Sequence, residues 1–447
     1  MSHSEAESLH AAAPWWQPRP GRHLSIQGGQ ALTGTYPVSG AKNAVLALMM
    51  SSLLTPGLVT LHNVPCILDV AVLANLLQGL GVNLSWSHGS HGLSVTLCAD
   101  HVHPARIDRG LVTRMRASVL LLGTVLARCG EVWLPMPGGD DIGLRGIDFH
   151  IAGLRAMGAR IDLDGGVVHA TAPDGLKGAD IRLPFPSVGA TQNLLLAAVL
   201  AQGTTVIRNA AREPENIDLA QCLGQMGAMI SGVGSDELTI EGGRVLGGAV
   251  HQVMPDRIEL GTMACAAAAT DGELLLRHGR MELLGAAAPL FGAAGVELRE
   301  VADGVIARRA AGGLRGTDIV TGPYPGFATD LQSPAMALLA MAPGASAVTE
   351  TMFEQRFRHV DELRKMGANI NVQGRTGFIR GVPHLAGAQV TATDVRAAAA
   401  LVLAGLAARG ETILDGLDHL DRGYDRMEEK LGACGARLRR GDRFEWG

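Results

Sequence analysis

The chain has 447 residues, of which 47% are hydrophobic and 18% are charged, so it can bury a large core and is unlike a disordered protein. Its length suggests two or three domains. The formal net charge of -5 and the aromatic content of 4% argue against a nucleic-acid partner, which would need a broad basic surface or a base-stacking platform.

The N-terminal stretch and the cysteines give no sign of secretion. Residues 1–23 lack the basic start and long apolar run of a signal peptide, and we expect them to form a flexible tail. The six cysteines show neither CxxC pairs nor zinc-ligand spacing, which indicates reduced thiols and no metal site. Apolar runs such as 397–408 are shorter than the ~20 residues of a membrane span. We therefore expect a cytoplasmic protein without a membrane partner.

A pattern of two glycines recurs six times along the chain. An apolar helix ends in a glycine that opens a strand, and an amphipathic helix then ends in a second glycine before another strand. The first series is Gly57, Gly130, Gly203, Gly272, Gly344 and Gly410, and the second is Gly81, Gly158, Gly227, Gly295, Gly367 and Gly435. Glycine just past a helix is typical of a C-terminal cap, because it adopts the left-handed conformation at little cost.

The glycine pattern predicts six α/β units, each roughly 70 residues long. One such unit cannot easily bury its apolar face alone. Three units around a helical core would make a domain of ordinary size, and two such domains would use the whole chain. The sequence therefore predicts an α/β fold with three repeats in each of two domains.

Polar residues gather at the start of the first helix in each unit. They include Lys42, Asn43, Arg114, Arg116, Ser187, Thr191, Asp256, Arg257, Glu259, Asp330, Asp394 and Arg396. Helix N-termini attract anions, and capping explains the Ser, Thr and Asp residues. Capping does not explain Lys42, Arg116 and Arg396, because a cation at a helix start is mildly unfavourable. Their repeated presence suggests an anionic ligand.

Lys42 is one of only four lysines in a chain whose positive charge is mostly arginine. In the motif SGAKNA it suggests a compact, rotatable ammonium that arginine would not replace. The alternative is a solvated surface lysine.

The segment LPMPGGDDIGLRGIDFH, residues 134–150, contains two adjacent glycines followed by two adjacent acids, and then an arginine and a histidine. Glycines let a loop bring its backbone close to a ligand. Asp140 is either a salt-bridge partner of Arg145 that shapes the loop or a proton-transfer group. We expect Asp141 to be solvated.

Ten motifs in order carry a resemblance to a known family. They are SGAKNA (39–44), MRAS (115–118), PGGDDIGLR (137–145), SVGAT (187–191), NAAREPE (209–215), PDRIE (255–259), FATDLQ (327–332), TETMFEQRF (349–357), ATDVRA (392–397) and HLDRGYDR (419–426). Together they resemble the UDP-N-acetylglucosamine enolpyruvyl transferases, whose relative in the shikimate pathway shares their fold.

The resemblance implies an inside-out α/β barrel in two domains. The first would comprise 24–41 and 256–447, and the second 42–255, with residues 137–145 as a lid loop. The implied reaction moves the enolpyruvyl group of phosphoenolpyruvate to the 3-hydroxyl of the GlcNAc ring of UDP-GlcNAc and releases phosphate, in the first committed step of peptidoglycan synthesis. Phosphoenolpyruvate and UDP-GlcNAc would be the only partners, without a cofactor, for a monomer or weak homo-oligomer.

The resemblance also assigns roles to residues. Lys42, Arg116, Arg145, Arg396 and Arg422 would bind the anionic groups of phosphoenolpyruvate, with Lys42 and Arg422 counted as catalytic. Asp330 would be the base or orienter of the sugar hydroxyl, and Asn43 would contact the sugar. The remaining substrate-binding positions are Gly146, Ile147, Asp148, His150, Ser187, Val188, Gly189, Met352, Arg356 and Asp394.

Asp140 stands where many family members have a cysteine that protonates the methylene carbon of phosphoenolpyruvate. A carboxyl group can do this if a closed site raises its pKa. Asp140, together with Phe185 and Leu68 where others have lysines, resembles a branch of the family. We expect such a protein to resist fosfomycin, which alkylates the thiol. Gly146, where proline is usual, is a further departure.

Two alternatives stay open from the sequence. One is enolpyruvyl transfer to another uridine nucleotide such as UMP, as in nucleoside-antibiotic synthesis. The other is a non-catalytic paralogue that binds UDP-GlcNAc. The second would predict loss of the phosphoenolpyruvate cations, yet Lys42, Arg116, Arg145, Arg396 and Arg422 are all present.

Overall fold

The computed structural model describes residues 3–17, 19–89, 92–103 and 107–441. These residues divide into two compact units. Unit 1 takes its residues from Met1–Gln17, Gly40–Gly139 and Arg145–Met254, and unit 2 from Pro18–Ser39, Asp140–Leu144 and Pro255–Gly447. Each unit has one hydrophobic core of its own.

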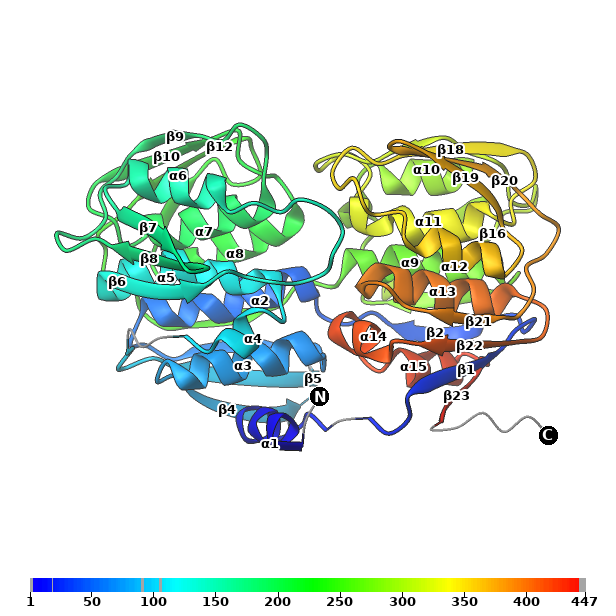
Figure 1. Cartoon of the computed structure of the whole chain (residues 1–447), viewed down its shortest axis with the longest axis horizontal. Coiled ribbons are helices and arrows are strands. Elements are labelled where there is room, and N and C mark those ends of the chain that lie inside the picture. Colours follow the sequence, from blue (N-terminus) through cyan, green and yellow to red (C-terminus); the bar gives the residue numbers. More distant parts are fainter. Residues whose placement is uncertain (1–2, 18, 90–91, 104–106, 442–447) are drawn as a thin grey trace. The chain divides into compact units, whose positions relative to one another are not determined.

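Unit 1 contains three sheets and the helices that pack on them (Figure 1). Its helices are α1 (His3–Ala12), α2 (Lys42–Ser51), α3 (Leu68–Gly79), α4 (Arg109–Val112), α5 (Leu120–Cys129), α6 (Asp148–Ala156), α7 (Val188–Ala198) and α8 (Pro214–Gln225), with 3₁₀ turns η1 (Ser52–Leu54) and η2 (Arg116–Val119). Its strands are β3 (Val59–His62), β4 (Asn83–Gly89), β5 (Gly92–Cys98), β6 (Glu131–Pro135), β7 (Arg160–Asp164), β8 (Val167–Thr171), β9 (Asp180–Arg182), β10 (Thr204–Arg208), β11 (Met229–Ser231), β12 (Glu237–Glu241) and β13 (Ala249–Gln252). The sheet orders are β13-β3-β5-β4, β6-β8-β7 and β11-β12-β10-β9.

Unit 2 repeats this architecture with three four-stranded sheets. Its helices are α9 (Arg257–Ala269), α10 (Ala287–Ala293), α11 (Gln332–Leu339), α12 (His359–Lys365), α13 (Val395–Ala407), α14 (Leu417–Gly423) and α15 (Met427–Ala433), with 3₁₀ turns η3 (Met281–Leu284) and η4 (Thr329–Leu331). Its strands are β1 (His23–Gln27), β2 (Thr33–Pro37), β14 (Glu273–Arg277), β15 (Val296–Val301), β16 (Gly304–Arg309), β17 (Ile319–Val320), β18 (Ala345–Thr349), β19 (Asn369–Gln373), β20 (Thr376–Arg380), β21 (Gln389–Thr391), β22 (Glu411–Asp415) and β23 (Arg437–Gly441). The sheet orders are β15-β16-β14-β2, β17-β18-β20-β19 and β21-β22-β1-β23.

The first helix of each repeat lies inside its unit, with the sheets outside. In unit 2, α9, α11 and α13 pack on one another, and Figure 1 shows them between the sheet of β18–β20 and the sheet of β21 and β22. Every residue of α9 and α11 is buried. A helix that is apolar on all sides belongs in a core, and the Ala-rich sequences of these helices let their backbones pack closely. The predicted α/β fold of six repeats is confirmed in this arrangement of six sheets.

The repeat glycines end the helices as the sequence predicts. Ten of the twelve have positive φ values, which favour glycine. The other two, Gly57 and Gly272, serve a different purpose, because a Cβ atom there would lie 2.5 and 2.1 Å from backbone atoms of neighbouring segments.

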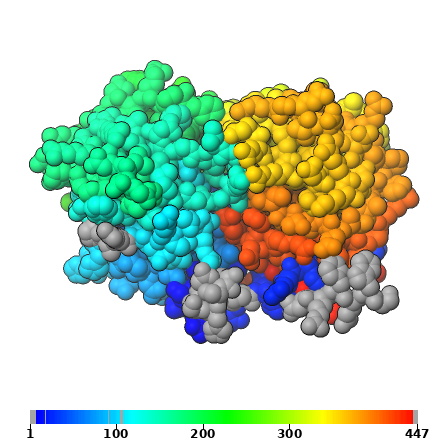
Figure 2. All heavy atoms as spheres, in the orientation of Figure 1, coloured from blue at the N-terminus to red at the C-terminus, as the bar shows by residue number. Residues whose placement is uncertain are grey.

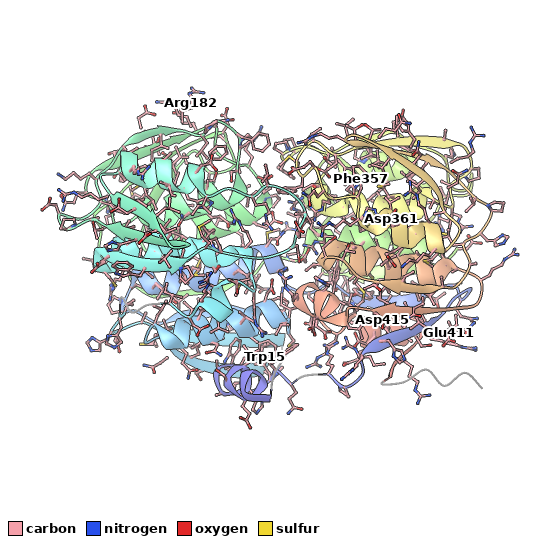
Figure 3. All side chains as sticks on the ribbon, viewed as in Figure 1. Trp15, Arg182, Phe357, Asp361, Glu411 and Asp415 are labelled. Carbon is pink, nitrogen blue, oxygen red and sulfur yellow. The ribbon has the colours of Figure 1, made fainter. Side chains whose placement is uncertain are left out.

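The N-terminal segment differs from the flexible tail expected from the sequence. Residues 1, 2 and 18 lie outside the described residues. Helix α1 packs on α3 in unit 1, and its atoms are among the dark blue spheres in Figure 2. Leu9 and Trp16 are buried, and the Trp86 Nε1–H donates to the carbonyl oxygen of Ala12 at 2.9 Å. Trp15, labelled in Figure 3, meets the Trp86 ring edge-on at 5.3 Å. The burial of these apolar side chains stabilises the packing of the N-terminal segment on unit 1.

Candidate active site

Lys42 begins α2 and forms a buried ion pair in unit 1. Its Nζ atom lies 2.9 Å from Oδ2 of Asp69, which is in the first turn of α3, and both side chains are buried. Asn43, the next residue, is half-buried. Sequence reasoning missed Asp69, although it is the one acid in the apolar run CILDVAVLANLL. The attraction between the charges of a buried ion pair offsets little more than the cost of removing them from water. The presence of this pair therefore favours a role other than stability.

Arg116 and Arg145 put two guanidinium groups close together. Arg116, at the start of η2, donates from Nη2 to the carbonyl oxygen of Gly146 at 2.6 Å. Burial and the charge of Arg145 together lower the pKa of Arg116 to about 10, with Asp148 opposing the shift. Arg116 is therefore still protonated at neutral pH, beside a second cation, as suits an anion site.

Gly146 lies against the start of α6. A Cβ atom at this position would be 2.4 Å from Oδ1 of Asp148, so a larger residue would displace that carboxylate. Ile147 is buried in the N-cap position of the same helix.

His150 brings the 145–150 segment to the start of α7. Nδ1 of the buried ring accepts from Asn193 Nδ2 at 2.9 Å. A Cβ atom on Gly189 would lie 3.5 Å from Cε1 and 3.6 Å from Nε2 of His150. Ser187 caps α7 by accepting the N–H of Ala190 at 3.3 Å, and Val188 is the first residue of that helix.

Asp330 is held by two arginines in unit 2. Arg356 donates from Nη2 to Oδ1 at 2.7 Å, and Arg396 donates from Nε and Nη2 to Oδ2 at 3.0 and 2.9 Å. Burial raises the pKa of Asp330, but the charges of Arg396 and Arg356 outweigh this and hold it well below its usual range. The carboxylate is therefore ionised at all ordinary pH values.

Helix α13 positions Arg396 at its first turn. Asp394 caps the helix by accepting the N–H groups of Arg396 and Ala397 at 2.9 and 3.0 Å. The guanidinium carbon of Arg396 lies 5.5 Å from the centre of the Tyr424 ring, which supports a cation–π contact. The cap by Asp394 and the contact with the Tyr424 ring together hold the long side chain of Arg396 in one conformation.

Glu350 organises the segment that contains Met352 and Arg356. Its buried carboxylate accepts from Met352 N–H at 2.7 Å, and from the hydroxyls of Thr321 and Thr329 at 2.9 and 2.8 Å. Arg356 also donates from Nη1 to Thr329 Oγ1 at 2.9 Å. Glu350 was not among the predicted site residues, and its only sequence signal is its place in TETMFEQRF.

Asp140 is paired with Arg422 in unit 2. Arg422 Nη1 donates to Asp140 Oδ1 at 2.6 Å, and His419 Nδ1 lies 3.7 Å from the same oxygen. Arg422 and His419 are both on α14. Two of the predicted catalytic residues, 282 positions apart in the sequence, therefore meet directly. His419 is a third titratable neighbour that sequence reasoning did not single out.

Residues 141–144 pack against the segment that precedes α12. Leu144 N–H donates to Glu354 Oε1 at 2.7 Å, and the carbonyl oxygen of Ile142 accepts from Gln355 N–H at 3.1 Å. Asp141 is exposed, as expected, and pairs with Arg358 at 2.6 Å. These bonds hold the loop beside Asp140 in a defined conformation.

Leu68 and Phe185, which stand where other family members have lysines, differ in their surroundings. Leu68 is buried at the start of α3, whereas Phe185 is 39% exposed. Among the residues that the structure describes, no group of three His, Cys, Asp or Glu side chains could hold a metal ion. Within the same ranges, no helix combines the length and apolar character that a bilayer span requires.

The sequence and structure are similar to known enolpyruvyl transferases. A family profile described as EPSP synthase (3-phosphoshikimate 1-carboxyvinyltransferase) matches residues 26–431. UDP-N-acetylglucosamine 1-carboxyvinyltransferase of Acidiphilium cryptum is 54% identical, over 93% of this chain and 99% of the relative. The enzyme of the same name from Rhodospirillum centenum is 51% identical, over 93% and 98%.

Solved structures agree with the fold. The enolpyruvyl transferase NikO from Streptomyces tendae superposes with a TM-score of 0.84 at 27% identity, over 95% of this chain and all of that one. EPSP synthase from Acinetobacter baumannii gives 0.69 at 20% identity, over 93% and 99%. The chain therefore belongs to the EPSP synthase family and, within it, groups with the UDP-N-acetylglucosamine 1-carboxyvinyltransferases.

Proposed function

We propose that this protein transfers the enolpyruvyl group of phosphoenolpyruvate to the 3-hydroxyl of the GlcNAc ring of UDP-GlcNAc, releasing phosphate, in peptidoglycan synthesis. The observation that carries the proposal is the identity of 50% or more, over nearly the full length, to relatives named for this activity. The clusters of buried cations in both units add physical support, because both substrates are anionic.

The reaction proceeds by addition and elimination. In the addition, the 3-hydroxyl gives its proton to a base and its oxygen bonds to C2 of phosphoenolpyruvate. The electron pair of the C2=C3 double bond takes up a proton at C3, which gives a tetrahedral ketal. In the elimination, the C2–O bond to phosphate breaks and C3 loses a proton, which restores the double bond. The protein must supply a proton donor near C3 and cations for the phosphate and carboxylate; Lys42, Arg116, Arg145, Arg396 and Arg422 are the candidates.

Asp140 is the proposed proton donor to C3, in place of the cysteine of many relatives. Arg422 donates to its carboxylate at 2.6 Å, so the acid and a candidate phosphoenolpyruvate-binding cation lie side by side. We assign the chain to the aspartate branch of the family and expect it to resist fosfomycin.

Asp330 is proposed to orient the sugar hydroxyl. A carboxylate held by Arg356 and Arg396, with a pKa well below its usual range, is a weak base and a strong hydrogen-bond acceptor. It becomes a base only if substrate weakens one of these pairs. Asn43, Met352, Arg356 and Asp394 are assigned to the sugar-nucleotide.

Residues 145–150 and 187–189 are proposed to hold the uridine nucleotide, with residues 137–145 as a lid. We also propose a cytoplasmic monomer or weak homo-oligomer, because both substrates are cytoplasmic metabolites. The predicted domain division, 24–41 with 256–447 against 42–255, remains part of this proposal.

A second acceptor is favoured by one observation. The structure superposes with NikO at a TM-score of 0.84, so a different enolpyruvyl transferase shares the fold closely. Its identity is only 27%, against 54% for the first of the named relatives. UMP, the acceptor that the sequence left open, stays the second candidate.

Phosphate release from phosphoenolpyruvate tests the proposal. The purified protein is incubated with phosphoenolpyruvate and UDP-GlcNAc, UMP or no acceptor. We expect release with UDP-GlcNAc only. Phosphate release with UMP alone would make UMP the acceptor in place of UDP-GlcNAc. Binding of UDP-GlcNAc without phosphate release in any reaction would favour a non-catalytic paralogue.

A further inference from the structure

The ring of His150 is held by an amide in the centre of unit 1. Asn193, in the middle of α7, is fully buried, and its Nδ2 atom lies 2.9 Å from His150 Nδ1. Its other amide atom, Oδ1, accepts the backbone N–H of Gly123 at 2.9 Å. A side chain on Gly123 would begin 2.4 Å from that oxygen, so the glycine permits the contact.

This chain of bonds determines which nitrogen of His150 carries the proton. The backbone N–H of Gly123 can only donate, so the amide atom of Asn193 that faces it must be the oxygen. The NH₂ group of Asn193 therefore faces His150 and donates, and Nδ1 of His150 must be the acceptor. In the neutral ring the single proton is then on Nε2.

The surroundings keep the ring neutral. Burial and, to a lesser degree, the charge of Arg116 lower the pKa of His150 to about 3. Charged groups on the elements packed against α6 lie on β7 and β9, and α6 itself carries Asp148 and Arg155. The strand residues, Arg160, Asp162, Asp164, Asp180 and Arg182, are exposed, and Figure 3 shows Arg182 at the outside of unit 1. Helix α7 contributes no titratable side chain.

The protonated edge of the ring faces the start of α7. Nε2 and Cε1 of His150 are the atoms nearest to a Cβ built on Gly189, at 3.6 and 3.5 Å. Any side chain at that position would contact this edge, whereas glycine leaves it uncovered. Nε2–H is thus a neutral donor beside the N–H groups of the first turn of α7.

We propose that Asn193 is a positioning residue that fixes His150 as an Nε2–H donor to an acceptor oxygen of the nucleotide. The proposal rests on the assignment of 145–150 and 187–189 to the nucleotide under the proposed function. The acceptor is a phosphate oxygen or a uracil carbonyl oxygen, which share this chemistry. Because the donor is uncharged, its contribution does not change between mildly acidic and alkaline pH.

The protonation state of His150 can be measured without any activity. Protein labelled with ¹⁵N in its histidines is examined by long-range ¹H–¹⁵N correlation at pH 6 and pH 8, and His150→Gln identifies the signal. We expect a neutral ring with the proton on Nε2 at both pH values. A proton on Nδ1, or a charged ring at pH 6, overturns the proposal.

Asn193→Asp reverses the direction of the hydrogen bond to His150 and keeps the size of the side chain. A carboxylate accepts from Gly123 and from Nδ1, so the neutral ring loses its Nε2 proton. We expect KM for UDP-GlcNAc at pH 8 to rise roughly tenfold or more, with kcat nearly unchanged, and to fall as the pH is lowered and the ring becomes charged. A KM at pH 8 equal to that of the wild type contradicts the proposal.

Asn75→Asp is the matched control. It adds the same charge to unit 1 and keeps its bond, because the Ser8 hydroxyl, now 2.7 Å from Nδ2, can donate to a carboxylate. Its KM should have the pH dependence of the wild type.

Binding of UDP and of uridine, measured by calorimetry at pH 8, separates this proposal from the proposed function. Asn193→Asp should weaken UDP alone if phosphate is the acceptor, or both ligands if uracil is. Unchanged binding of both overturns the proposal. If wild-type protein transfers no enolpyruvyl group but binds UDP, only the reaction assignment fails.

Discussion

At the scale of single residues, the most specific chemical prediction concerns Asp140. Asp140→Ala removes the proposed proton donor, and we expect kcat to fall by about 10²-fold or more, the usual contribution of a positioned acid. Asp140→Cys restores a proton donor, so activity should return at least in part. Steady-state kinetics of phosphate release measures both.

Fosfomycin distinguishes the wild-type protein, with Asp140, from the Asp140→Cys variant. The wild-type protein should keep its activity after incubation with the drug, whereas Asp140→Cys should be inactivated with time because a thiolate can be alkylated. Rapid loss of wild-type activity would show that the drug acts elsewhere and that the position has been misread. Mass spectrometry of the treated proteins provides the control.

Asp330 should matter for stability as well as for activity. Asp330→Asn removes the carboxylate that pairs with the buried Arg356 and Arg396, which costs about 3 kcal/mol, near the lower end for a broken buried pair because Asp330 is partly exposed. Since its folded-state pKa is lowered, the stability it contributes is fully present above about pH 4 and lost as pH falls through that pKa.

Urea unfolding at pH 7 compares Asp330→Asn with Asp361→Asn. The latter breaks an exposed pair with Arg364 and should cost less than about 1 kcal/mol. Equal losses in the two variants would mean that the pairs around Asp330 contribute no more than a surface pair.

The sequence points to some of the candidate site residues and not to others, for a physical reason. Lys42, Arg116 and Arg396 were identifiable because cations are unusual at helix starts. Asp69 and Glu350 were not, since their importance arises from partners that folding brings to them. The sequence offered Arg145 as a partner of Asp140; the structure shows a bond to Arg422, from a distant part of the chain.

At the scale of elements, helix α1 is expected to stabilise unit 1. Deleting residues 1–17 removes the buried side chains Leu9 and Trp16 and exposes the part of α3 and Trp86 that they cover. Burial of two large apolar side chains contributes several kcal/mol, at roughly 1.5–3 kcal/mol each. The thermal unfolding midpoint of the truncated protein should therefore fall by several degrees, measured by calorimetry.

Asn75→Ala serves as the comparison, because it removes only the bond to Ser8. It should lower the midpoint far less than the deletion does. An unchanged midpoint in the truncated protein would mean that the segment is the loose tail that its sequence suggested.

The helices that end at the repeat glycines, and the strands that follow them, were predictable because local chemistry determines both. Gly130 and Gly203 end their helices or open their strands with positive φ values, as the pattern requires. The N-terminal segment was not predictable, since its helix depends on apolar contacts with α3 and β4 that no local signal reveals.

At the scale of the whole molecule, buried histidines should make the protein sensitive to acid. Burial lowers the pKa of His359 to about 4; Asp394 opposes this shift and Arg356 adds to it. The unfolded chain binds this proton near pH 6.5 and the folded chain does not. Stability is therefore full above about pH 6.5 and is lost as pH falls toward 4, by about 2 kcal/mol at pH 5.

The free energy of unfolding at pH 7.5 and pH 5.0 tests this, with His359→Phe as the variant. The wild type should lose about 2 kcal/mol more than the variant between the two pH values, because the variant has no proton to bind at this site. Parallel losses would show that His359 is protonated in the folded protein.

The number of repeats was readable from the sequence, but the way their sheets are completed was not. Strand β2 pairs with β14, and β13 pairs with β3, so each unit closes a sheet with a strand from a distant part of the chain. Strand β1 likewise lies between β22 and β23. Such pairings depend on tertiary topology, which periodicity does not encode.

The most direct test of the central claim is the identity of the product. Phosphoenolpyruvate labelled with ¹³C at C2 is incubated with the protein and an equal mixture of UDP-GlcNAc and UMP, and the products are followed by ¹³C NMR. We predict a vinyl ether carbon coupled to the 3-position of the GlcNAc ring, together with an equal amount of free phosphate. Phosphoenolpyruvate that stays unchanged in the presence of bound UDP-GlcNAc, or a label transferred to UMP instead, would contradict the account.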